Sequence, residues 1–452
     1  MEEPKTAEDR PSKFRIYLIV MAVSTLNLST GAVTGWSSPI LPKLNLTSFE
    51  QGLVTSLYSF GAAPGPFITT FCLDTIGRKG TLSVIWFFYL ASWIILLISQ
   101  NVYVIYFARI IGGLGVGGAL NGIPVYVTEV AIPEIRGPLG AASTLMIGLG
   151  ALAMYWVGPY VTYTTISIYG IATATLFAVV FFFVPESPFH HIRKGRGKEA
   201  EVAIQKLRGY RTRTKLEEEL EEIKKTVIRN EQNAVGWLEG MKHPAASRSI
   251  GLGLFLTTMT LSTGLMVQGA YAQTIFSSYE LSFPASYIGM INVVCSILFK
   301  FLPIWMVNKC VGMKTSIILS GFTSGLTCVV LGIYFYLIRA GYDLYNYSYL
   351  AIVLTVANTL AHSIGLGTLV WTMVAELLPM CLKGIGTGIV GCVNSLLGFG
   401  LLQIFPVIAS SYGYSTNFFG LAIIMFILSA MGIFILPDTT GKTVQELEEL
   451  FM

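Results

Sequence analysis

The sequence predicts an all-α membrane protein with about twelve transmembrane helices. Hydrophobic residues make up 53% of the 452 residues and charged residues only 12%, whereas charged residues account for about a quarter of a soluble globular chain. A helix needs about 20 mainly apolar residues to cross roughly 30 Å of hydrocarbon. Apolar windows of that length recur almost from one end of the chain to the other. Together, these observations exclude an ordinary soluble fold.

The apolar spans fall into two groups of six, separated by one long polar stretch. The first group is expected at residues 14–36, 51–73, 80–99, 102–127, 138–159 and 164–184. The second is expected at residues 249–277, 285–307, 314–338, 348–377, 384–407 and 413–436. Repeated bundles of this kind are common in transporter folds. We therefore expect two six-helix bundles, residues 14–184 and 249–436, with a helical linker over residues 185–248 and tails over residues 1–13 and 437–452.

The predicted linker contains two charged runs with helix-forming composition, GKEAEVAIQKLRGY and RTKLEEELEEIKKTVIRN. In the second run, Glu precedes Lys at a spacing that stabilises an exposed helix. Two interpretations stay open. The linker is either a solvated helical connection or a small helical bundle that docks beneath the two halves and latches one of their states.

The distribution of Lys and Arg predicts a multi-pass protein with both termini in the cytoplasm, because short basic loops are retained on that side. Only Lys43 and Arg339 fall in loops expected on the opposite side. Asn45 and Asn346 begin N-x-S/T sequons in those outer loops. Both are therefore predicted glycosylation sites.

Several other classes of function are disfavoured by the sequence. The net charge of +4 comes from short basic clusters between apolar spans, not from a basic face with interleaved aromatics that would bind nucleic acid. The six cysteines lie singly, without the paired spacing of disulfide frameworks or metal sites. The chain has no phosphate-binding loop and no recognisable catalytic set. We expect no metal, no cofactor and no enzymatic activity; the expected partners are membrane lipids and a small-molecule substrate, and the oligomeric state is not predicted.

Two motifs in the first group of spans combine glycines with charged residues. Residues 74–79 (DTIGRK) form the turn between the second and third spans, where Gly77 permits a tight bend. Residues 109–137 contain several glycines that allow close helix approach. The same segment carries Arg109, Glu129 and Arg136. Charges at membrane depth are costly unless they are paired, so these side chains are expected to find partners.

The chain resembles the sugar-porter branch of the major facilitator superfamily, and residues 36–44 (WSSPILPKL) are most similar to the insect facilitated trehalose and sugar transporters. The resemblance covers essentially the whole chain. It rests on residues 74–79, 109–137 and 185–188, on Trp371 with residues 376–379 and 383–384, and on residues 437–442. It implies the major facilitator fold, in which two six-helix bundles rock about a midplane site. It also implies facilitative transport of a sugar such as glucose or trehalose across the cell membrane.

By this resemblance, eight charged residues on the cytoplasmic side form inter-helix gating pairs that hold the outward-open state. The alternative is a set of permanent pairs at helix ends, each worth about 0 to 1 kcal/mol when exposed. The eight residues are Asp74, Arg78, Arg109, Glu129, Arg136, Glu186, Glu376 and Lys383. The second copy of the turn motif, residues 308–314, lacks the expected acid.

The resemblance also implies six substrate-binding residues in the fifth, seventh, tenth and eleventh spans: Thr144, Gln268, Tyr271, His362, Trp371 and Asn394. Thr144 replaces the family's fifth-span glutamine. Thr260, Leu261 and Met266 stand where the family has two glutamines and an asparagine. A sugar bound there loses hydrogen bonds to water that these side chains do not replace. His362 is interpreted as a packed neutral imidazole, a substrate hydrogen-bonding group or a proton-sensitive site.

The first span carries no acidic residue, where proton-driven relatives have an aspartate, so the resemblance favours downhill, uncoupled transport. Two alternatives stay open. One is a porter of the same fold for a polyol or other small organic solute, favoured by the missing seventh-span amides. The other is a membrane sensor that binds without transport, which the altered second turn motif would permit.

Overall fold

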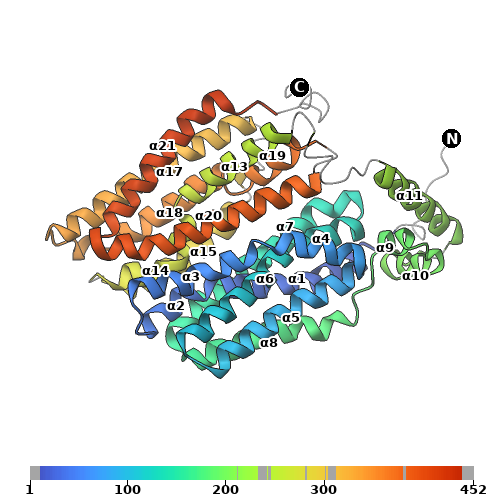
Figure 1. Cartoon of the computed structure of the whole chain (residues 1–452), viewed down its shortest axis with the longest axis horizontal. Coiled ribbons are helices and arrows are strands. Elements are labelled where there is room, and N and C mark those ends of the chain that lie inside the picture. The colour runs from blue at the N-terminus through green and yellow to red at the C-terminus, as the bar shows by residue number, and fades with distance from the viewer. Residues whose placement is uncertain are drawn as a thin grey trace.

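The computed structural model describes residues 11–210, 212–232, 242, 246–279, 282–300, 302–303, 312–379 and 383–439. Within these residues every regular element is a helix. Figure 1 shows two groups of helices side by side, which we call the N half (residues 13–181) and the C half (residues 246–435), with further helices of the linker at one end. We call that end the linker end and the opposite end the far end.

The helices of the N half run between these two ends. The long helices are α1 (Lys13–Gly35), α3 (Ser48–Ala62), α4 (Gly65–Thr75), α5 (Gly77–Ile98), α6 (Val102–Val130), α7 (Pro133–Val157) and α8 (Tyr163–Phe181), and the short ones are α2 (Ser37–Ile40), η2 (Leu41–Lys43) and η3 (Gly158–Tyr160). Polar residues at their starts satisfy free backbone N–H groups. Thr47 and Glu50 form a capping box at α3, and the Asn101 side chain accepts from the Tyr103 N–H at α6.

The C half has a similar set of helices. They are α13 (Ala246–Ser262), α14 (Leu265–Ser277), α15 (Ser286–Phe299), α17 (Met313–Arg339), η4 (Tyr345–Tyr347), α18 (Tyr349–Ile364), α19 (Leu369–Leu377), α20 (Lys383–Tyr412) and α21 (Tyr414–Ile435). In the part of the chain that the structure describes, ten helical stretches are long and apolar enough to cross a membrane, and α15 is a shorter apolar helix. Together with the α3–α4 pair, they account for the twelve predicted spans.

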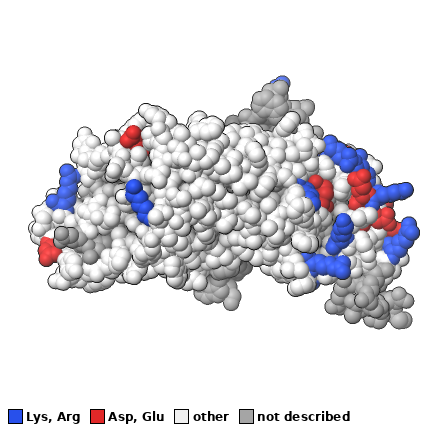
Figure 2. Space-filling view, turned by 90° about the horizontal axis from the view of Figure 1, so that it is seen from below, with Lys and Arg blue, Asp and Glu red and all other residues white. Residues whose placement is uncertain are grey.

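Charged side chains lie mainly toward the two ends of the molecule and leave a broad uncharged belt between them (Figure 2). Many large apolar side chains are exposed on the helices of this belt, including Phe87, Phe107, Leu326 and Ile427. A soluble protein rarely exposes apolar surface on this scale. The belt is the surface expected to face the hydrocarbon of a bilayer.

The helix is broken within three of the predicted spans. The span at 51–73 is interrupted between α3 and α4, where Pro64 and Pro66 cannot donate backbone hydrogen bonds. The span at 249–277 breaks at Gly264, whose φ of +74° suits glycine. The span at 348–377 unwinds between α18 and α19. The breaks matter because two of them, in the C half, lie at the candidate site.

The described linker helices form a small bundle rather than an isolated solvated helix. They are α9 (Pro188–Arg193), α10 (Gly197–Arg208) and α11 (Arg213–Gln232), and they share a core of Ile204, Leu216, Ile223 and Val227. Arg208 joins this bundle to the N half, because its guanidinium donates to the Val130 carbonyl at 2.6 Å and its own carbonyl accepts from Ser12 N at 2.8 Å. The bundle therefore docks beneath the N half.

Candidate functional site

A cavity of about 290 Å³ lies in the C half between the two broken spans and α20. Its lining residues are Thr257, Thr260, Leu261, Leu265, Met266, His362, Trp371 and Asn394. Three of the six predicted substrate-binding residues, His362, Trp371 and Asn394, are therefore brought together. The positions Thr260, Leu261 and Met266, where the family pattern has amides, lie around the same cavity.

The helix break between α13 and α14 is held by a side chain that the sequence analysis did not single out. Asn358 on α18 donates from Nδ2 to the Thr263 carbonyl at 3.0 Å, and its Oδ1 accepts from Thr327 at 2.8 Å. Asn358 is fully buried. Helix breaks at membrane depth persist only where freed backbone groups find partners. In the sequence, this residue could have been recognised as an amide in the middle of an apolar span.

The polar groups that remain free in the cavity are few. Thr257 and Thr260 donate their hydroxyl hydrogens to backbone carbonyls of their own helix, at 3.1 Å in each case, so they present only acceptor lone pairs. His362 Nδ1 has no hydrogen-bond partner among the described residues. The Trp371 side chain is 44% exposed. The cavity therefore combines an aromatic surface and an imidazole with apolar walls.

The other three predicted substrate residues do not line this cavity. Thr144 is exposed on α7 and donates to the Ala141 carbonyl at 2.8 Å. Tyr271 is buried, and its hydroxyl donates to the Leu402 carbonyl at 2.8 Å. Gln268 is 1% exposed, and neither atom of its amide has a partner in the described part of the chain. Tyr271 thus joins α14 to α20 and has no hydroxyl hydrogen left for a ligand.

A network of ion pairs and backbone hydrogen bonds lies at the linker end of the N half. The Arg78 guanidinium binds the Glu129 carboxylate through two hydrogen bonds, of 2.5 and 2.8 Å. Arg78 is 3% exposed. The Glu186 carboxylate accepts from three backbone N–H groups, those of Arg78, Lys79 and Ser187, at 2.8 to 3.0 Å. The network joins α5, α6 and the start of the linker.

The linker helix α9 extends this network. Asp74 pairs with Arg193 at 2.8 Å, but this pair is largely exposed and is worth about 1 kcal/mol or less. His190 Nδ1 lies 3.3 Å from Arg78 Nη1. Burial and the nearby Arg78 charge lower the pKa of His190 to about 4. The imidazole is therefore neutral at physiological pH and can accept a hydrogen bond from Arg78.

Arg109 does not belong to this network, contrary to the expectation from the sequence. It lies near the far-end start of α6, and its guanidinium donates to the Val33 and Val54 carbonyls at 2.7 and 2.9 Å. The rings of Trp36 and Tyr58 lie within 5.2 Å of its Cζ. Arg109 is 1% exposed, so it connects α1, α3 and α6 through carbonyls and aromatic faces instead of a carboxylate.

The three remaining members of the predicted gating set are Arg136, Glu376 and Lys383. Arg136 is exposed and Glu376 is partly buried. Among the described residues neither forms an ion pair. Lys383 begins α20, but its side chain lies outside the described part of the structure.

Hydrogen bonds between the two halves lie between the far end and the middle of the bundle. In the described part of the chain they join Ser56 to Gln403, Gln403 to Phe49, Ser59 to Ser395, Gln273 to Ser38 and Tyr155 to Gly269. No ion pair between described residues crosses from one half to the other. Among the described residues, the hydrogen bonds that join the two halves therefore lie toward the far end, and none lies at the linker end.

Comparison with known proteins places the chain in a family. The family model described as sugar (and other) transporter matches residues 14–451. The chain is 28% identical to the sugar transporter ERD6-like 6 of Arabidopsis thaliana, with 98% of this chain and 91% of that protein covered. It is 27% identical to the facilitated trehalose transporter Tret1 of Bombyx mori, with 95% and 86% covered.

A human protein and a bacterial structure extend this likeness. The chain is 26% identical to the human solute carrier family 2, facilitated glucose transporter member 6, with 97% of this chain and 91% of that protein covered. Its fold is similar to the inward-open xylose transporter XylE of E. coli, with a TM-score of 0.81, 21% identity, and 97% and 100% of the two chains covered. The fold is therefore that of the major facilitator superfamily, and the chain belongs to the sugar (and other) transporter family.

Proposed function

We propose that this protein is a facilitative transporter that carries a sugar such as glucose or trehalose across the cell membrane by alternating access. The observation that carries the proposal is the cavity in which His362, Trp371 and Asn394 meet beside two broken helices. Broken helices at the bilayer midplane commonly form the substrate site of transporters. An aromatic ring that lies against a sugar, together with a few directed hydrogen bonds, suits this substrate class.

Uncoupled transport is supported by the absence of acidic residues along the described path. Helix α1 carries no Asp or Glu, and the residues that line the cavity include none. Coupled proton transport needs a group that gains and loses a proton as the halves move. His362 is the titratable group in the cavity lining, so it is the residue to test if a proton gradient proves to drive uptake.

A second candidate is a porter of the same fold for a less polar organic solute or a polyol. The observation that favours it is the apolar lining at Leu261, Leu265 and Met266. A site with fewer directed donors binds a many-hydroxyl ligand less tightly, because the hydroxyls lose water contacts without replacement. Competition between glucose, trehalose and less polar solutes for the same flux separates the two candidates.

The direct test is uptake of radiolabelled glucose and trehalose into proteoliposomes that contain the purified full chain, with and without an imposed proton gradient. Saturable uptake that ignores the gradient is the expected result. Uptake that requires the gradient would contradict the uncoupled mode. Binding without any flux of either sugar, in protein that is well folded, would favour the sensor alternative.

We also propose that the far end faces the outside of the cell and that both termini are cytoplasmic. Asn45 and Asn346 are both exposed, in the connection between η2 and α3 and in η4. In protein made in eukaryotic cells, N45Q and N346Q are each expected to remove one glycan, measured as a gel shift that endoglycosidase abolishes in the unsubstituted protein. A mobility that neither the substitutions nor the enzyme changes would contradict this orientation.

A further inference from the structure

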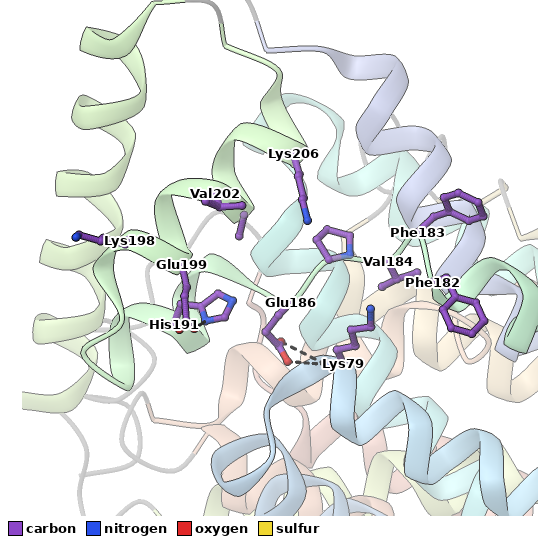
Figure 3. A pocket seen from close by; sticks show the side chains of 12 residues that line it. Lys79, Phe182, Phe183, Val184, Glu186, His191, Lys198, Glu199, Val202 and Lys206 are labelled. Carbon is purple, nitrogen blue, oxygen red and sulfur yellow. Dashed lines mark hydrogen bonds and ion pairs between the residues drawn. The ribbon is translucent and has the colours of Figure 1, made fainter.

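We propose that a pocket at the linker end, between the end of α8 and helix α10, binds the headgroup of an anionic membrane lipid. This inference does not depend on which solute the protein carries, or on whether it carries one. The pocket has a volume of about 500 Å³ and lies outside the substrate cavity. Its lining includes Lys79, Phe182, Phe183, Glu186 and Lys206 (Figure 3).

Two lysines direct positive charge into this pocket from different elements. Lys79 begins α5 and Lys206 lies near the end of α10, and Figure 3 shows both ammonium groups directed into the space between them. Neither forms an ion pair with a residue that the structure describes. The Lys79 ammonium instead lies 4.6 Å from the centre of the Phe181 ring. Like charges that converge in this way favour an anionic ligand.

The acidic residues that line the pocket are already engaged. The Glu186 carboxylate accepts from the backbone N–H groups of Arg78, Lys79 and Ser187. Glu199 pairs with His191 at 3.1 Å and with Arg196 at 3.5 Å. The Glu186 charge still attracts Lys79, but neither lysine ammonium forms an ion pair with a described carboxylate. A phosphate group would supply that charge and accept hydrogen bonds from both lysines.

The apolar side of the pocket points to a lipid as the source of the anion. Phe182 and Phe183 follow the end of α8 and are 82% and 79% exposed. They line the pocket together with the two lysines, where the chain leaves α8 and enters the linker (Figure 3). A free phosphate ion gains nothing from the two phenyl rings, whereas acyl chains next to a bound headgroup would cover them. Basic residues at the cytoplasmic surface attract anionic lipids of that leaflet.

The test is native mass spectrometry of the full chain, released from vesicles of phosphatidylcholine with a minor fraction of phosphatidylserine. K79Q/K206Q is compared with the unsubstituted protein, and K206Q is compared with K194Q. Lys194 follows helix α9 and is also exposed, but it does not line the pocket. We expect retained phosphatidylserine to fall on the order of tenfold in the double variant and by a smaller factor in K206Q. Retention in K194Q should not change.

Two further measurements separate loss of lipid binding from loss of folding, and lipid from free phosphate. Because Lys206 is exposed, K206Q is expected to fold even if the double variant does not, and thermal unfolding in detergent checks both. F182S/F183S should lower phosphatidylserine retention without changing the binding of inorganic phosphate. Retention that is equal in K206Q and in the unsubstituted protein would overturn the proposal. Inorganic phosphate that binds the pocket while phosphatidylserine shows no preference over phosphatidylcholine would also overturn it.

Discussion

The linker end of the N half and the cavity of the C half differ in how far their polar side chains have hydrogen-bond partners. At the linker end, Arg78, Glu129 and Glu186 engage one another or backbone groups through several short hydrogen bonds. In the cavity of the C half, His362 Nδ1 is buried without a described partner. Buried polar groups without partners are costly in a finished core, whereas a binding site needs groups that a ligand can still satisfy.

We propose from this difference that the two halves have different roles. The N half, with its docked linker bundle, is a scaffold whose charges hold α5, α6 and α9 together. The C half contains two broken helices and a cavity, and no described ion pair fixes it to the N half. The two halves can therefore move relative to one another at the linker end without separating any described charged pair.

The largest effect is expected from Arg78→Ala. It leaves the largely buried Glu129 carboxylate, 14% exposed, without its partner, and breaking a pair of this kind costs about 3 to 5 kcal/mol. The free energy of unfolding of the purified protein should fall accordingly. Glu129→Ala in the Arg78→Ala background should recover part of the loss, because the orphaned carboxylate is gone. Additive losses would show that the two residues do not act as a pair.

A smaller loss is expected from Arg109→Lys. Lysine keeps the charge but not the planar fork that reaches the Val33 and Val54 carbonyls together. We expect about 1.5 to 3 kcal/mol of destabilisation, the range for a lost hydrogen bond to a charged group. Thermal unfolding and surface expression report it. Arg136→Lys is the matched control, since Arg136 is exposed. An equal loss of stability in Arg136→Lys would contradict a special role for the buried Arg109.

The smallest effect concerns pH and the docking of the linker. Burial and the Arg78 charge lower the pKa of His190 from 6.5 to about 4. The undocked state therefore binds a proton first as the pH falls, and docking should weaken between pH 6.5 and pH 4 and be fully retained above pH 6.5. Hydrogen exchange of residues 188–208 at pH 7.5 and pH 5 measures this. His190→Gln should remove most of the pH dependence, and an unchanged dependence would assign it to other groups.

The fold could be predicted well from the sequence because each membrane span must be long, apolar and helical. The helix breaks could not be predicted from the sequence. Gly264 is one of 46 glycines, and only its φ of +74° marks it as the break between α13 and α14. The far-end contacts of Gln403 with Ser56 and Phe49 could not be predicted either, because they depend on how the two halves pack together.

The candidate site was predicted in part. The motif residues Arg78, Glu129 and Glu186 meet because they lie at the same ends of neighbouring helices. Arg109 was predicted on the cytoplasmic side because it belongs to the same motif as Glu129 and Arg136. Its place along α6 shows otherwise, since it lies seven residues after Val102, near the far-end start of that helix. Thr144 and Tyr271 lie away from the cavity because helix rotation, which the apolar pattern does not fix here, decides what a side chain faces.

The most direct test of a solute site in the C half compares sugar uptake by Trp371→Ala and Trp156→Ala in proteoliposomes. Both tryptophans are exposed, at 44% and 59%, but only Trp371 lines the cavity. Loss of the aromatic contact at Trp371 should lower kcat/KM about tenfold with unchanged folding, and Trp156→Ala should transport normally. Equal uptake by the two variants would remove Trp371 from the substrate path and contradict the assignment.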